Sequence, residues 1–143
     1  MRENVVIRTV VRLAVPFIQI FALYVIVHGA SEPGGGFQGG VVLASSFILM
    51  MIAFDLTHAR QRISNREIMI FSALGIGIFA GTGLLCLLFA GNFLQYAVIE
   101  AALGIPHLHA YLIDLVEAGI GVTVMAVMTA IIYEMADRGG RSR

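Results

Sequence analysis

Two carboxylates near the start of the last apolar segment, Asp114 and Glu117, are the residues best placed for ion chemistry. They stand three positions apart, so on a helix they share one face, with Glu117 about 4.5 Å further along the axis. Neighbouring carboxylates can together hold a proton or a cation. We therefore predict that both acids contribute to an ion pathway. The alternative, which suits Asp114 better than Glu117, is a hydrated acid favoured by the helix dipole.

A third acid, Asp55, stands at the end of another apolar segment, just before His58 and Arg60. An acid beside a basic cluster commonly pairs with a guanidinium at the membrane surface. We expect Asp55 to pair with an Arg of this chain or of a neighbour, and we keep it as a further candidate for the ion pathway.

Residues 32–40 read EPGGGFQGG and place five glycines between two apolar segments. A phosphate-binding loop would need a preceding strand and a following Lys, and the chain contains no Lys. A tight turn needs only one or two glycines, so the excess indicates close approach of another helix or subunit to bare backbone. Phe37 would then act as an aromatic plug and Gln38 as a polar contact. The residues of this predicted packing motif, apart from Gln38, are Pro33, Gly34, Gly35, Gly36, Phe37, Gly39 and Gly40.

Two other features predict helix packing. Gly77 and Gly81 follow Ala73 at four-residue spacing, which is the small-residue pattern of close helix crossings in membranes. Gln19 lies inside the first apolar segment, where its amide is expected to form a hydrogen bond across a helix seam.

Metal and cofactor chemistry is not indicated. The four histidines include no pair at the four-residue spacing of a helical zinc site, and the chain has one cysteine. His107 and His109 are expected to lie outside, at the mouth of the protein. The chain lacks the soluble basic face that nucleic-acid binding requires. We predict no metal, no cofactor and no catalytic centre.

The composition places these residues in a membrane protein. Of the 143 residues, 59% are hydrophobic and 13% are charged, whereas soluble domains have about 25% charged residues. Four segments are long enough to cross the hydrocarbon core, which takes about 20 helical residues. We predict an all-α, single-domain chain over 1–143, with spans at 10–27, 40–56, 68–90 and 112–133.

The arginines predict the orientation of these spans. All nine basic residues are Arg, and with four spans they all fall on one side, in the two tails and the connection 57–67. Positively charged connections face the cytoplasm. The sequence therefore predicts cytoplasmic N and C termini in a multi-pass protein of the plasma membrane.

The connection at 91–111 is less polar than the others. Residues 93–103 are predicted to form a short helix on the outer surface or on a partner, and Gly104 would end it. Pro106 is expected in the first turn of the fourth span.

The stretch PGGGFQGG, which leads directly into VVLASSFILM, resembles the MnhB-type domain. That domain is the MnhB subunit of Mrp-type multisubunit sodium/proton antiporters, and it also occurs in membrane-bound energy-converting hydrogenases. The resemblance covers nearly the whole chain, including Pro16 in the first span and the acids that begin the last. It implies a four-helix subunit without its own cofactor, inside an assembly that exchanges sodium for protons.

Two functions follow from the resemblance. The first is a small antiporter subunit that serves mainly in packing and assembly, with acidic groups near an outer cation pathway. The alternative is the equivalent subunit of a membrane-bound hydrogenase or a related redox-driven sodium pump. Either role implies other membrane subunits and lipid as partners, with sodium ions and protons as the transported ions. A self-sufficient small channel is disfavoured, because few polar groups lie within the spans.

Overall fold

The computed structural model describes residues 5–29, 34–89 and 91–141 of the chain. All regular elements in these ranges are helices: α1 (Val5–Val27), α2 (Gly36–Phe54), α3 (Leu56–Arg62), α4 (Asn65–Leu88), α5 (Tyr96–Leu103) and α6 (Leu108–Arg141).

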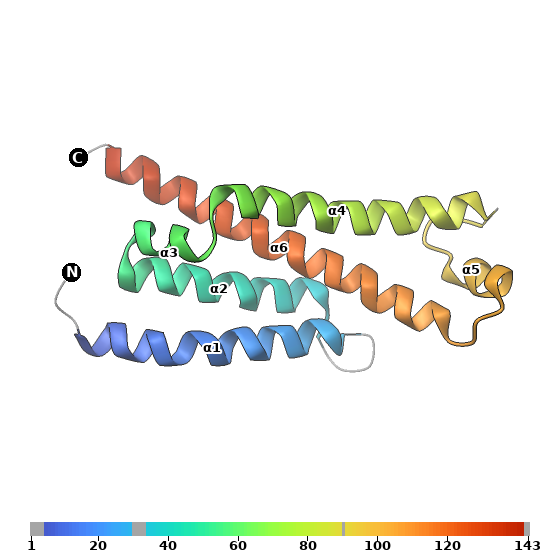
Figure 1. The fold of residues 1–143 in the computed structure, drawn as a ribbon, viewed down its shortest axis with the longest axis horizontal. Helices are drawn as coiled ribbons and strands as arrows, with labels where there is room; N and C mark the ends of the chain where they lie inside the picture. Colours follow the sequence, from blue (N-terminus) through green and yellow to red (C-terminus); the bar gives the residue numbers. More distant parts are fainter. Residues whose placement is uncertain (1–4, 30–33, 90, 142–143) are drawn as a thin grey trace.

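The four long helices lie side by side in the order α1, α2, α6, α4 (Figure 1). Helix α2 packs against α1 on one side and against α6 on the other, and α6 crosses diagonally to reach α4. Each of the four is long and apolar enough to cross a membrane. This confirms the prediction of an all-α chain with four candidate spans.

The predicted boundaries need correction at two connections. Residues 57–67, expected as a loop, contain helix α3, whose Ala59 is fully buried. Asp55 separates α3 from α2 because its φ of 88° interrupts the helical backbone. Pro106 precedes the fourth span by two residues instead of lying in its first turn, because α6 begins at Leu108 and runs on to Arg141.

Local sequence explains where α4 begins and where α5 ends. Ser64 and Glu67 form a capping box at the start of α4: the Ser64 amide donates to Glu67 Oε2 at 2.7 Å, and the Glu67 amide donates to Ser64 Oγ at 3.3 Å. Helix α5 is shorter than the predicted 93–103. Its end at Gly104 is confirmed, and that glycine has the left-handed φ of 66°.

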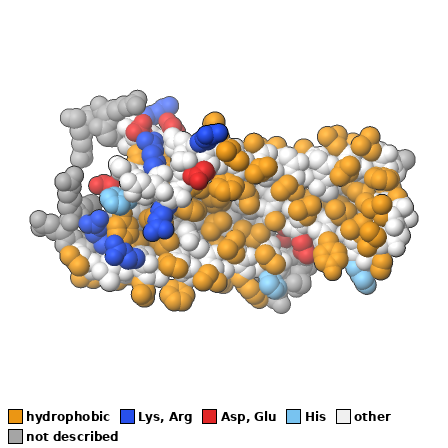
Figure 2. Space-filling model, viewed as in Figure 1, with side chains coloured by type: hydrophobic (Ala, Val, Ile, Leu, Met, Phe, Trp, Pro, Cys, Tyr) orange, Lys and Arg blue, Asp and Glu red, His pale blue; other side chains and the backbone are white. Residues whose placement is uncertain are grey.

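The buried core lies towards the end of the molecule that carries the arginines. Basic side chains gather at this end on the face drawn in Figure 2, near the start of α1, α3, the start of α4 and the end of α6. Most of the long apolar side chains elsewhere are exposed, so the chain leaves much apolar surface to lipid or to other proteins. The core residues from α2, α3, α4, α6 and the α3–α4 connection are Ala44, Ala59, Ile63, Ile68, Met125, Ala126 and Tyr133.

Candidate ion site and glycine packing motif

Within the glycine motif (residues 33–40), residues 36–40 form the start of α2 and lie between α1 and α6. A Cβ atom on Gly40 would stand 2.5 Å from the carbonyl oxygen of Gly121, and one on Gly36 would overlap the Glu117 carbonyl. Both neighbours belong to α6. These two glycines therefore let the backbones of α2 and α6 come into direct contact, because any side chain would hold them apart.

Gly39 makes the matching contact on the other face of α2. A Cβ atom there would stand 2.9 Å from the carbonyl oxygen of Ala22 and 3.0 Å from the Ile26 amide nitrogen, both in α1. The glycines at 36, 39 and 40 thus allow α2 to contact a helix on each side.

The remaining motif residues have different surroundings. Gly35 has a φ of 136°, a conformation that side-chain-bearing residues rarely adopt, so it provides the turn into α2. Gly34 lies near Val25, with a 3.1 Å approach of its would-be Cβ to a Val25 methyl. Pro33 lies outside the described residues. Phe37 is 62% exposed, so it plugs no seam within this chain, and its predicted contact would have to be with a partner.

Glu117 is brought against the glycine motif by the crossing of α2 and α6. Its Oε2 atom is buried and has no hydrogen-bond partner among the described residues. The same oxygen points at Gly29, beyond the end of α1, where a Cβ would overlap it. Leaving a carboxylate oxygen buried and unpaired costs free energy, so a proton, a cation or a donor from elsewhere would stabilise it.

The other two acids have different positions. Asp114 lies nearly one turn before Glu117 on α6 and is half-buried. Asp55 is exposed and lies at the far end of α2, a helix of 19 residues, which is about 28 Å long. Among the described residues, Arg60 lies 3.7 Å from Asp137 and not beside Asp55. The structure thus brings Asp114 and Glu117 together and leaves Asp55 apart.

The close crossing of α4 and α6 involves a different glycine from those expected. Gly75 and Gly119 face each other there, and a Cβ atom on Gly119 would stand 3.1 Å from the Gly75 carbonyl oxygen. A Cβ atom added to Gly77 or Gly81 would meet nothing within 4 Å. These two glycines form no crossing with the described residues of this chain, and their packing against a partner stays a prediction.

Gln19 joins α1 to α2. Its Nε2 donates to Oγ of Ser46 at 3.2 Å, and Ser46 itself is fully buried. A hydrogen bond between polar groups inside an apolar seam fixes the register of the two helices.

The connection between α4 and α6 contains a contact that was not predicted from the sequence. Glu100 of α5 accepts a hydrogen bond from the backbone amide of His109, at 3.1 Å, and contacts the His109 ring. These hydrogen bonds, led by that from the ring, lower the pKa of the Glu100 carboxyl. The carboxylate also lies at the start of α6, where the helix dipole favours negative charge.

We expect Glu100→Gln to remove a pH-dependent contribution to stability. Because folding lowers the pKa of Glu100, this contribution is present above the ordinary carboxyl pKa and is lost as pH falls through the lowered value. The melting temperature of the purified chain in detergent should therefore depend less on pH between about 3 and 5 in the variant. Glu134→Gln, which changes an exposed acid on α6, is the control. Identical pH profiles for Glu100→Gln and wild type would contradict the assignment.

Within residues 5–29, 34–89 and 91–141, no three His, Cys, Asp or Glu side chains are grouped so that they could hold a metal ion. His28 stacks on Tyr24 with ring centroids 4.3 Å apart.

Residues 6–130 match a family model described as a domain related to the MnhB subunit of Na+/H+ antiporters. Relatives of similar length carry the provisional name antiporter subunit mnhB2. One from Staphylococcus haemolyticus is 37% identical across 99% of this chain and 100% of its own length. Another, from Staphylococcus aureus strain MRSA252, is 38% identical over the same shares, and one from Staphylococcus epidermidis is 34% identical, again over 99% of this chain and 100% of its own.

Proposed function

Because the chain belongs to the family of domains related to the MnhB subunit of Na+/H+ antiporters, we propose that it is a small integral subunit of a multisubunit sodium/proton antiporter in the plasma membrane. Four apolar helices of spanning length support a multi-pass protein. The arginines gathered at the end where α1 begins and α6 ends support cytoplasmic N and C termini.

The main role of the subunit in this proposal is to pack and hold the assembly. Its four long helices form a layer, with α1 and α4 at the edges, and leave many large apolar side chains exposed. Gly77 and Gly81 offer bare backbone to a neighbour, and Phe37 offers an exposed ring. These features suit contact with other membrane subunits.

The ion-pathway part of the proposal rests on one observation, the buried Oε2 of Glu117, which has no hydrogen-bond partner among the described residues. It lies beside the backbone of the glycine motif and nearly one turn from Asp114, away from the arginine-bearing end of the molecule. A site of this kind, near the outer membrane boundary, can take up a proton or a cation and pass it on. Asp55 lies at the arginine-bearing end, so it would act at most near the cytoplasmic end of the ion pathway.

The proposal is tested by removing this chain from the assembly. Deletion should abolish sodium-dependent proton movement in everted membrane vesicles, and the full-length chain should restore it. The alternative role in a hydrogenase or redox-driven sodium pump makes a different prediction. In that case the complex purified through this chain would contain iron and nickel, and vesicles would need an electron donor for sodium transport. The antiporter names of the relatives favour the first outcome.

A further inference from the structure

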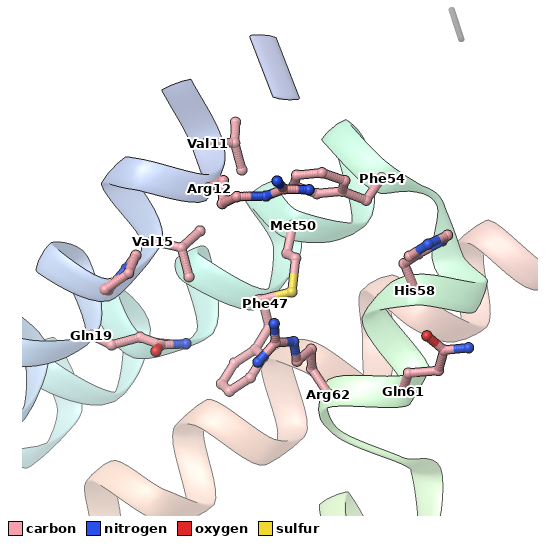
Figure 3. Close-up of a pocket in the computed structure, with 11 residues that line it drawn as sticks. Val11, Arg12, Val15, Gln19, Phe47, Met50, Phe54, His58, Gln61 and Arg62 are labelled. Atoms are coloured by element: carbon pink, nitrogen blue, oxygen red, sulfur yellow. The ribbon is translucent and has the colours of Figure 1, made fainter. Parts of the chain in front are cut away.

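A cleft of about 510 Å³ opens between α1, α2 and α3 at the arginine-bearing end of the molecule (Figure 3). Its volume falls within the range of about 300–1,000 Å³ that is usual for small-molecule sites. Neither the glycine motif nor Glu117 takes part in it. Its polar lining consists of Arg12, Gln19, His58, Gln61 and Arg62.

The charged side chains that line this cleft are all basic. Arg12 from α1 and Arg62 from α3 lie on two sides of it, with Met50 between them (Figure 3). Among the described residues, no Asp or Glu lines the cleft, and neither guanidinium has an acidic partner. Gln61 and His58 add further groups that can donate hydrogen bonds.

A third guanidinium comes close to the same cleft. The Phe54 ring, which is part of the lining, has the Arg8 guanidinium 5.1 Å and the Arg12 guanidinium 5.7 Å from its centroid. Contacts of this type hold cationic side chains in place without neutralising them. Like charges that converge without a counter-ion repel one another, so the cleft favours a bound anion.

The surface beyond the cleft is apolar. Along the face of α1 that carries Pro16, the next residues towards the membrane centre are Ile20 and Leu23, which are 66% and 53% exposed. The opposite wall, from α2, contains Phe47 and Met50. An anionic head with a hydrocarbon tail would therefore meet guanidiniums at one end and apolar side chains at the other.

We infer that this cleft binds the phosphate headgroup of an anionic phospholipid, with Arg12 and Arg62 as its main ligands. Guanidinium groups bind phosphate oxygens through paired hydrogen bonds. Basic pockets between membrane helices are typical places for such headgroups. The acyl chains lie along the exposed face of α1.

The test uses the full chain purified in a neutral detergent. Binding of dioleoyl phosphatidylglycerol is measured by native mass spectrometry and compared with dioleoyl phosphatidylcholine, glycerol phosphate and inorganic phosphate. We expect phosphatidylglycerol to bind most tightly. Each Arg→Gln change in the cleft should weaken it about fivefold, and the double variant Arg12→Gln/Arg62→Gln should weaken it more than either single change.

Two variants distinguish lipid binding in the cleft from general attraction of the lipid to positive charge. Arg12→Lys/Arg62→Lys keeps the positive charges and should retain part of the affinity. Arg66→Gln removes an exposed arginine from the same end of the molecule but outside the cleft, and should leave the affinity unchanged. Equal losses for Arg66→Gln and Arg62→Gln would overturn the inference.

Other results would also overturn it. Equal binding of phosphatidylcholine would exclude recognition of anionic charge. Inorganic phosphate that competes as well as the lipid would make the cleft a site for a soluble anion. In the assembled complex, a photo-crosslinker in place of Gln61 should capture lipid, and capture of a protein subunit would mean that a partner fills the cleft.

Discussion

Replacing Glu117 with Gln is expected to lower sodium/proton antiport by about tenfold or more, the effect of losing one hydrogen bond or contact to a charged group. The substitution keeps the size of the side chain, so the α2–α6 crossing beside Gly36 should stay intact. Antiport is measured in everted vesicles as sodium-induced proton movement across a range of pH. The amount of assembled complex is determined in the same vesicles.

The controls for this prediction lie on the same helix. Glu134→Gln also removes an acid from α6, at an exposed position towards the arginine-bearing end, and should leave antiport unchanged. Asp114→Asn should have a smaller effect than Glu117→Gln, because Asp114 has no buried orphan oxygen. An unchanged pH profile for Glu117→Gln, with normal activity, would remove Glu117 from the ion pathway.

Gly36→Ala should destabilise the chain, whereas the same change at Gly77 should not. The new Cβ at position 36 would overlap the Glu117 carbonyl, and forcing helices apart in a packed core costs about 1–3 kcal/mol. At Gly77 nothing lies within 4 Å of the new Cβ, so the higher helix propensity of Ala should stabilise the chain by up to about 1 kcal/mol. The melting temperatures of the purified chains in detergent should therefore shift in opposite directions.

Assembly provides a second measurement for the same positions. Gly36→Val, with a larger side chain, should prevent formation of a stable complex. Phe37→Ala should melt like the wild-type chain, because the ring is 62% exposed, yet it should weaken co-purification of the other subunits. If Gly36→Val complexes purify intact but show altered dependence on sodium, the glycine motif serves ion transport and not packing.

The long helices could be predicted from the sequence because continuous apolar runs have few other stable forms in a membrane. Helix α3 could not be predicted in this way, since its seven residues, LTHARQR, are too few to span a membrane and resemble a charged loop. The burial of its Ala59 in the core depends on contacts between distant segments. The extension of α6 beyond residue 133 was missed because Glu134, Asp137 and Arg138 interrupt the apolar pattern.

The candidate site, too, could be predicted only in part from the sequence. The spacing of Asp114 and Glu117 indicates that they share a helix face, and the glycine excess at 32–40 indicates close packing. The sequence does not indicate that these two features meet, because that depends on how α6 is rotated against α2. The matching spacing of Gly36 and Gly40 on α2 with Glu117 and Gly121 on α6 was a signal that could have suggested it. Likewise, α4 has two glycine series, and only the rotation of the helix selects Gly75 over Gly77.

The most direct measurement is a density map of the whole antiporter complex with this chain in place. We predict that Glu117 faces a hydrated passage away from the arginine-bearing end, and that Phe37 contacts a neighbouring subunit. A map in which Glu117 is sealed against lipid, with the arginines on the outer side of the membrane, would contradict the account.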